Sequence, residues 1–311
     1  MKKTTLFIAM ATVLGFQATA IAEPTLEIGG VVEVEASSGD DTSDITVATV
    51  EVGLAAQINE KVAAEVVLLH EEDETDLSID TATINLAFTD TLRVTAGQTY
   101  IPFGVFDSNM ISDPLTLELA ETSATALQAD ITTGPLIASL YTFNGVNAEE
   151  EIDNWGVNFA WANDNLFLAL GYLANIGDTD TIAAETLDSK VPGISMSASV
   201  KVAGFSLTGE YISANDEFQI GDGNADYQFT ARAQPSATNI ELAYSTGETT
   251  FAVGVQNTDE AEDLGLPEKR ALAAISHELM ENTLVALEWA GDEDYTGERS
   301  DTVTAQLAVA F

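Results

Sequence analysis

Apolar and polar residues alternate through most of the chain beyond residue 25, and this pattern constrains the fold more than any other feature. Leu26 and Ile28 flank Glu27 near the start of the pattern. The chain ends on an apolar face formed by Val303, Ala305, Leu307, Val309 and Phe311. A period of two residues is typical of β-strands that turn one face to an apolar environment and the other to water. The sequence therefore predicts an all-β protein.

The predicted strands, about 8–12 residues each, are joined by two kinds of connection. Tight turns fall at 59–61, 89–91, 133–135, 163–165, 203–204 and 281–282. Longer, mostly acidic connections fall at 37–43, 71–76, 146–152, 175–190, 259–267 and 291–300. The two kinds largely take turns, as in outer-membrane barrels, whereas a soluble β-sandwich has no reason to sort its loops. We therefore predict a transmembrane antiparallel β-barrel of about 16 strands with a water-filled lumen.

The strand count is ambiguous in one region. Residues 224–233 resemble a strand, with Tyr227, Phe229 and Ala231 on one face. If this segment were a barrel strand, the total would be odd and acidic loops would fall at the wrong end. We therefore predict that residues 215–235 form one long external excursion with some β-structure.

The charge and hydropathy of the chain fit a barrel in a membrane. Asp and Glu number 51 against 10 Lys and Arg, a net charge of -41, which argues against nucleic acid as a partner. Yet 46% of residues are hydrophobic, so the chain is not a disordered acidic one. There is no cysteine, and therefore no disulfide or thiolate metal site. A closed sheet with one face toward lipid and one toward water reconciles these properties.

The first 22 residues have the pattern of a secretory signal peptide. Lys2 and Lys3 precede an apolar run over residues 6–16, and Ala20-Ile21-Ala22 supplies small residues for cleavage. The run is too short for a helical membrane span. We predict a signal peptide over residues 1–22, a barrel over residues 23–311, and a location in the bacterial outer membrane. The expected surroundings are outer-membrane lipid and lipopolysaccharide.

Residues 100–126 break the alternation. Two prolines argue against a lipid-facing strand, and residues 115–126 have the composition of a short helix. A long connection inside a compact domain is usually functional, so we predict that it folds into the lumen and narrows the pore. The residues assigned to this constriction are Pro102, Phe103, Gly104, Asp107, Asp113, Glu118 and Glu121.

The same region resembles a known family. The run GQTYIPFG over residues 97–104, followed by DPLTLELAET over residues 113–122, is similar to the LbtU family of siderophore porins. The Pro-Phe-Gly, Pro-Leu-Thr, Glu-Leu and Glu-Thr elements carry the match, and the signal peptide, length and strand spacing agree with it. The resemblance implies an outer-membrane barrel linked to uptake of iron–siderophore complexes. A general porin without a dedicated ligand is the alternative, because fold does not fix substrate.

If the polar face of each strand points inward, eight acids face three bases in the lumen. The inward acids are Glu27, Glu33, Glu35, Glu51, Glu65, Glu210, Glu241 and Glu288, and the inward bases are Arg93, Lys201 and Arg270. Carboxylates that line a pore concentrate cations and repel anions, so we predict a cation-preferring lumen. The constriction acids either face the opening, with the bases across from them, or point at the wall and pair there. Such a lumen suits cationic or neutral siderophores better than anionic ones.

Other classes of function fit the sequence less well. The chain has two histidines, His70 and His277, and neither lies near a Ser and a carboxylate with catalytic spacing. We therefore expect no enzymatic activity, no cofactor and no metal site. A secreted soluble β-rich binding protein is the third hypothesis. The sequence does not distinguish a monomer from the trimer that porins of this size often form.

Overall fold

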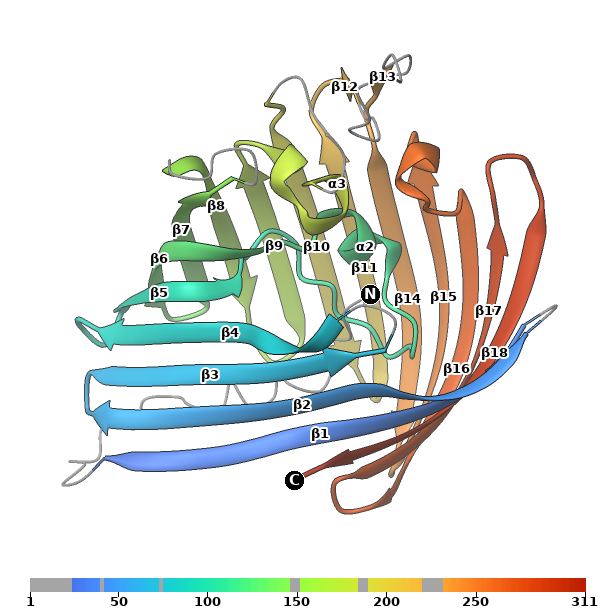
Figure 1. Ribbon diagram of the computed structural model, residues 1–311, viewed down its shortest axis with the longest axis horizontal. Coiled ribbons are helices and arrows are strands. Elements are labelled where there is room, and N and C mark those ends of the chain that lie inside the picture. The colour runs from blue at the N-terminus through green and yellow to red at the C-terminus, as the bar shows by residue number, and fades with distance from the viewer. Residues whose placement is uncertain (1–23, 40–41, 73–74, 146–151, 184–189, 220–231) are drawn as a thin grey trace.

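Sixteen strands form a closed antiparallel barrel in the computed structural model, which describes residues 24–39, 42–72, 75–145, 152–183, 190–219 and 232–311 (Figure 1). The predicted signal peptide lies outside the described residues. The barrel strands in chain order are β1 (Thr25–Ser38), β2 (Ser43–Asn59), β3 (Val62–Glu71), β4 (Thr75–Ala87), β5 (Leu92–Tyr100), β6 (Ser123–Thr133), β7 (Leu136–Asn144), β8 (Ile152–Ala162), β9 (Leu166–Leu173), β10 (Gly193–Val202), β11 (Phe205–Ala214), β14 (Ser236–Thr246), β15 (Thr249–Asp259), β16 (Lys269–Met280), β17 (Thr283–Glu293) and β18 (Arg299–Ala310).

The ring is closed by its first and last strands. β1 pairs with β18, with Val31 opposite Ala310, and Gly30 exchanges two backbone hydrogen bonds of 3.0 Å with Phe311. β11 pairs directly with β14. The short strands β12 (Phe218–Gln219) and β13 (Arg232–Ala233) pair only with each other, outside the barrel sheet. The parity argument for residues 215–235 is therefore confirmed where this region is described.

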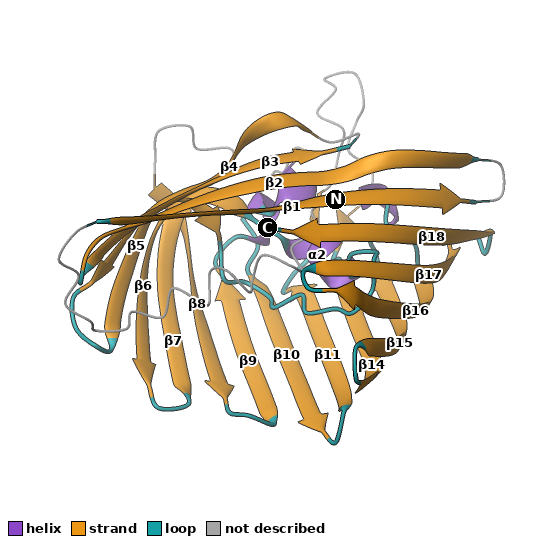
Figure 2. Cartoon of the chain, turned by 90° about the horizontal axis from the view of Figure 1, so that it is seen from below, coloured by secondary structure: helices purple, strands orange, loops and turns teal. Residues whose placement is uncertain are grey.

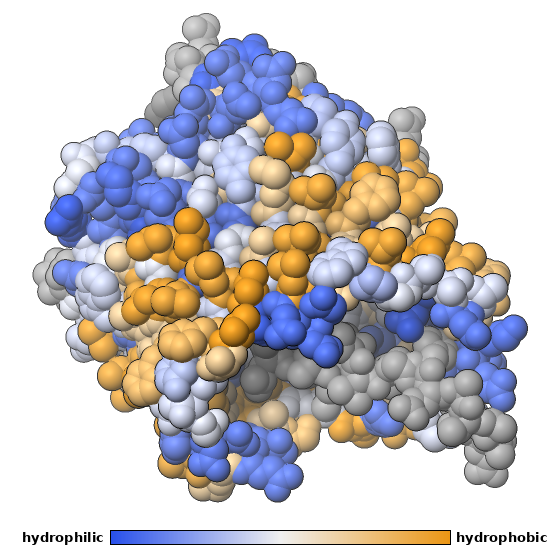
Figure 3. Space-filling model, turned by 180° about the vertical axis from the view of Figure 1, so that it is seen from behind, coloured by the Kyte–Doolittle hydropathy of each residue, from blue (hydrophilic) through white to orange (hydrophobic). Residues whose placement is uncertain are grey.

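The outer face of the barrel is apolar. Large hydrophobic side chains are exposed at alternate strand positions, as at Leu26, Ile28, Phe159, Leu207 and Val253. In Figure 3 the apolar side chains gather in a band over the strands, and hydrophilic side chains gather toward the ends. Exposed apolar area on this scale is stable only against lipid. Among the described residues, no helix is long and apolar enough to cross a membrane.

The connection between β5 and β6 lies inside the ring of strands and carries the helix α2 (Leu115–Ala120), as Figures 1 and 2 both show. The β9–β10 connection contributes the 3-10 helix η1 (Ile176–Asp178) and the helix α3 (Asp180–Ala183), and η2 (Glu262–Leu264) lies between β15 and β16. These connections share an apolar cluster with the inner wall, in which Phe103, Leu119, Ile176, Ile182 and Ile212 have no exposed surface. This cluster holds the inward connection to one side of the barrel.

Candidate functional site

The inward segment comprises residues 101–122, and it is shorter than the predicted 100–126 because Tyr100 belongs to β5 and residues 123–126 belong to β6. It is an insertion in a β-hairpin. Tyr100 and Ser123 are register partners, so the strands are paired up to both ends of the segment. Phe103 is fully buried in the apolar cluster, and Gly104 follows with φ of 98°. Only glycine adopts this backbone conformation without strain. The Pro-Phe-Gly element thus anchors the segment and turns it along the wall, while the Pro102 carbonyl accepts a hydrogen bond from Asn158 Nδ2 at 2.8 Å.

A row of acceptors on four strands of one wall, β11, β14, β15 and β17, holds the segment. Glu210 on β11, Glu241 on β14, Gln256 on β15 and Glu288 on β17 are all buried, with 5%, 2%, 1% and 1% of their surface exposed. Each accepts at least one backbone N–H from the segment. Glu210 and Gln256 lie at the same level of the wall, because the register sets both opposite Asn239, and Glu241 lies two residues further along β14. The segment is not part of the sheet, so its backbone N–H groups have no partner strand, and the row supplies the hydrogen-bond acceptors instead.

The contacts are dense at each carboxylate. Glu210 accepts from the backbone N–H of Val105 at 2.7 Å and Phe106 at 3.2 Å, and from the hydroxyls of Ser197 at 2.6 Å and Thr116 at 2.8 Å. Each oxygen of the carboxylate thus receives one backbone donor and one hydroxyl. Charge-assisted hydrogen bonds of this kind are the strong ones, and all of them are shielded from water.

The next two carboxylates repeat the arrangement. Glu241 accepts from the Ser108 hydroxyl at 2.8 Å and from the Asn109 side chain at 2.6 Å. Glu288 accepts from the N–H of Ile111 at 2.5 Å and of Ser112 at 3.1 Å. Glu210, Glu241 and Glu288 are thus covered by the segment and do not line open water.

Arg270 also faces the segment. Its Nε and Nη2 donate to the two oxygens of Asp292 at 2.8 and 3.0 Å, and its Nη1 lies 3.9 Å from Glu118 on α2. Burial raises the pKa of the Glu118 carboxyl to about 7, against the opposing influence of Arg270. Because two carboxylates surround this guanidinium, it adds little positive charge to the lumen.

The predicted constriction residues divide into two sets. Phe103, Asp113 and Glu121 are buried, Pro102 and Gly104 are half-buried, and Glu118 lies beside Arg270. Among the constriction acids, Asp107 alone is exposed, near Lys201. The residues that the sequence groups as one constriction are thus mostly anchors of the segment.

The opposite wall, formed by β1–β4, is acidic. The Glu51 carboxylate is repelled by the like charges of its neighbours Asp80, Glu71, Glu33 and Glu65. Within the described part of the chain, no Lys or Arg lies within 4.0 Å of the carboxylates of Glu33, Glu51 or Glu65.

The remaining predicted lumen residues lie around this wall and beside it. Glu35 accepts a hydrogen bond from Gln306 at 2.8 Å. Glu27 and Arg93 are exposed, and Arg93 is the register partner of Asp130 on β6.

Sequence reasoning missed the polar residues that dock the segment. Gln256 and Asn158 lie on strand positions where an amide is unremarkable, and their roles appear only once the segment is placed against them. The role of Gly193 likewise appears only in the structure, where a Cβ at this position would lie 2.9 Å from Ile176 and 3.0 Å from Phe103. In the described residues, no group of three or more acidic or histidine side chains is arranged to hold a metal ion.

A closed sixteen-stranded barrel with an apolar outer band and an inward segment defines a channel of the bacterial outer membrane. The chain belongs to the Gram-negative porin family, whose sequence pattern it matches over residues 8–296. It is a porin for diffusion of small solutes across the outer membrane.

Solved porin structures share the fold at low sequence identity. OmpF of Salmonella typhi, in complex with daunomycin, superimposes with a TM-score of 0.68 at 10% identity, over 94% of this chain and all of that one. The outer membrane channel DcaP of Acinetobacter baumannii gives 0.66 at 14% identity, over 93% and 98%. OmpT of Vibrio cholerae in its trimer form gives 0.63 at 12% identity, over 93% and 100%.

Two sequence relatives carry names that state no activity. A UPF0422 protein of Legionella pneumophila strain Paris is 25% identical over 93% of this chain and 67% of its own length. A UPF0422 protein of Coxiella burnetii is 30% identical over 67% of this chain, which spans about half (49%) of that relative.

Proposed function

We propose that this porin prefers cations over anions. The observation that carries the proposal is the unequal charge of the lumen. The β1–β4 wall holds Glu33, Glu51 and Glu65 without a basic partner among the described residues, whereas Arg270 is matched by Asp292. Uncompensated carboxylates raise the local concentration of cations in a narrow aqueous passage.

The test is the reversal potential of the refolded protein in a planar bilayer across a KCl gradient. The expected potential has the sign of K⁺ permeating faster than Cl⁻. It should shrink as both salt concentrations rise, because the Debye length falls from about 10 Å at 0.1 M to about 3 Å at 1 M. A potential with the sign of Cl⁻ permeation would refute the proposal and make the bases the effective charges of the lumen.

Uptake of ferric siderophores is the narrower function that the resemblance to siderophore porins suggests. An acidic wall favours ferric complexes with zero or positive net charge over anionic carboxylate complexes. A positively charged ferric trihydroxamate should therefore reduce the ion current at lower concentration than ferric citrate does. If both ferric complexes reduce the current equally and without saturation, a general porin without a dedicated ligand is favoured.

Two further properties belong to the same proposal. The barrel acts as a channel and not as an enzyme, because its conspicuous buried carboxylates already bind the inward segment. It assembles as a trimer, in line with the trimer form of the similar Vibrio cholerae protein. Cross-linking in mild detergent tests the assembly, and a single band at monomer mass would contradict it.

A further inference from the structure

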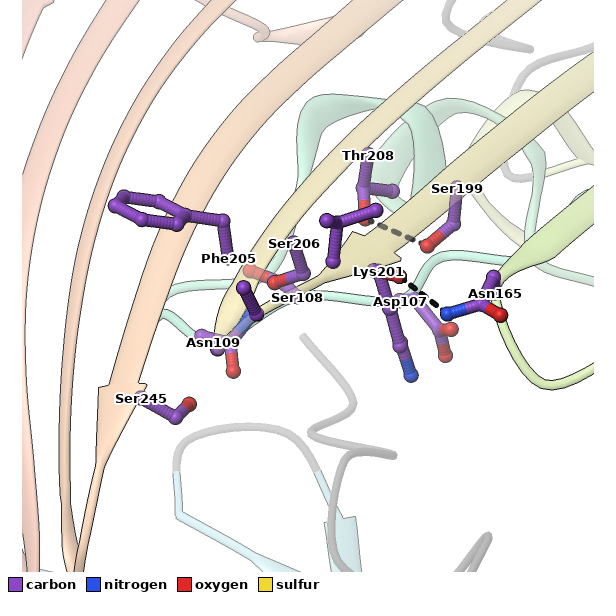
Figure 4. Close-up of a pocket in the computed structure, with 13 residues that line it drawn as sticks. Asp107, Ser108, Asn109, Asn165, Ser199, Lys201, Phe205, Ser206, Thr208 and Ser245 are labelled. Atoms are coloured by element: carbon purple, nitrogen blue, oxygen red, sulfur yellow. Dashed lines mark hydrogen bonds between the residues drawn. The ribbon is translucent and has the colours of Figure 1, made fainter.

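A polar cavity of about 640 Å³ lies beside the tip of the inward segment, at the end of the barrel with the short turns. The tip contributes Asp107, Ser108 and Asn109 (Figure 4). The wall contributes Ser199 and Lys201 from β10, Ser206 and Thr208 from β11, Ser245 from β14 and Asn165 from the β8–β9 turn. Short turns mark the periplasmic end of outer-membrane barrels, so the cavity opens where solutes leave the pore.

Two side chains of opposite charge line this cavity and do not form a salt bridge with each other. Lys201 and Asp107 are both exposed, and no ion pair of 4.0 Å or less joins them in the described residues. The charges are near enough to interact, because Lys201 opposes the desolvation that raises the pKa of Asp107. Neither side chain makes a hydrogen bond or an ion pair with another described residue. The pair therefore offers one cationic and one anionic group to a molecule that enters.

Hydroxyl groups surround the two charges. Thr208 donates to Ser199 over 3.5 Å, which is a weak contact, and the Ser206 hydroxyl has no partner among the described residues. Ser108 and Asn109 are held by Glu241, which fixes the tip that presents Asp107. The charged group on the segment is thus positioned by a buried anchor, as a preorganised site requires.

We propose that this cavity binds small zwitterions of the amino-acid and short-peptide class, with the ligand carboxylate at Lys201 and the ligand ammonium at Asp107. The inference rests on the proposed function, because the ligand reaches the cavity through the lumen. The volume lies in the range of about 300–1,000 Å³ that small-molecule sites occupy, and it accepts a dipeptide with water. Because both charges are exposed, the binding is weak and rapid, as diffusion through a channel requires.

The experiment measures block of K⁺ current by glycylglycine added on the short-turn side of the refolded protein in a bilayer. Lys201→Gln and Asp107→Asn each remove one charge of the cavity. Lys61→Gln and Asp90→Asn make the same charge changes in turns at the same barrel end, away from the cavity, and serve as matched controls. Binding of glycylglycine in detergent micelles, read by saturation-transfer NMR, reports on the site without requiring conduction.

The expected result is saturable block, with a half-blocking concentration about fivefold higher in each cavity variant and unchanged in each control. Acetate and sucrose should block at much higher concentrations than glycylglycine. If acetate blocks as well as glycylglycine, the site binds simple anions and does not require a zwitterion. If sucrose blocks equally well, the site binds hydroxyl groups and does not read charge. Either result overturns the proposal. So does the absence of binding in micelles. An anion-selective channel that still binds glycylglycine would refute the proposed function and leave this site standing.

Discussion

Glu210→Gln should loosen the inward segment from the wall. The two oxygens of Glu210 each receive one backbone donor, from Val105 at 2.7 Å and from Phe106 at 3.2 Å. A glutamine has only one acceptor oxygen, so its NH₂ group opposes one of these N–H groups in either orientation. The hydroxyls of Ser197 and Thr116 can reverse their roles, but a backbone N–H cannot. The loss is about 2 kcal/mol, the worth of a hydrogen bond to a charged acceptor.

Glu241→Gln is the matched control, because it removes the same charge from the adjacent strand. There a glutamine oxygen in the place of Oε1 retains the bonds from the Asn109 N–H at 3.0 Å and from the Asn109 side chain at 2.6 Å. Its NH₂ group meets the Ser108 hydroxyl, which accepts, and only the longer contact of the Asn109 N–H, at 3.2 Å, is lost. Hydrogen exchange of peptides that cover residues 103–117, followed by mass spectrometry in detergent, measures the opening of the segment. A loss of 2 kcal/mol corresponds to about 30-fold faster exchange, expected in Glu210→Gln and much smaller in Glu241→Gln. Equal acceleration in both variants would refute the reasoning.

Three further predictions concern the lumen and the segment. Deleting residues 105–122 should raise single-channel conductance, since the strand ends already pair and a short hairpin can replace the segment; unchanged conductance would contradict its role in narrowing the pore. Changing Glu33, Glu51 and Glu65 together to Gln should move the KCl reversal potential toward zero, and an unmoved potential would show that these side chains do not face the ion path. Burial raises the pKa of Glu118 from 4.5 to about 7, so the folded state binds its proton more tightly than the unfolded chain. That stabilisation is complete below pH 4.5 and is lost as pH rises through 7. The thermal unfolding midpoint in detergent should therefore fall over this pH window, and it should fall less in Glu118→Gln. Parallel pH profiles of the midpoint in the two proteins would argue against the raised pKa of Glu118.

The architecture was predictable because lipid imposes a simple rule on the sequence. Every spanning strand must turn apolar residues outward and may place polar residues inward, which leaves a two-residue period that needs no knowledge of partners. The order of tight and long connections then fixes the parity of the strand count. The same rule predicted that residues 215–235 lie outside the barrel, although residues 224–233 alone resemble a strand.

The arrangement within the lumen was harder to predict, because it depends on which wall the inward segment contacts. Glu210 and Glu51 have the same signal in the sequence, an acid on the polar face of a strand. The first is covered by the segment, and the second lies on the opposite wall among other carboxylates. Phe103 and Ile182 meet in one apolar cluster although their segments are far apart in the chain. A local periodicity in the sequence does not predict such a long-range contact.

The pairing of Gly30 with Phe311 also has a consequence for how the barrel forms. Until these two distant residues meet, the growing sheet has two open edges, β1 and β18, that can pair with another chain. Joining them closes a loop of nearly the whole described chain, at an entropic cost of about 5 kcal/mol, so closure comes late and brings many contacts at once. Glu27, Glu33 and Glu35 follow one face of β1. Charges along an unpaired edge disfavour intermolecular pairing, so we expect these glutamates of β1 to protect the unfinished sheet from aggregation.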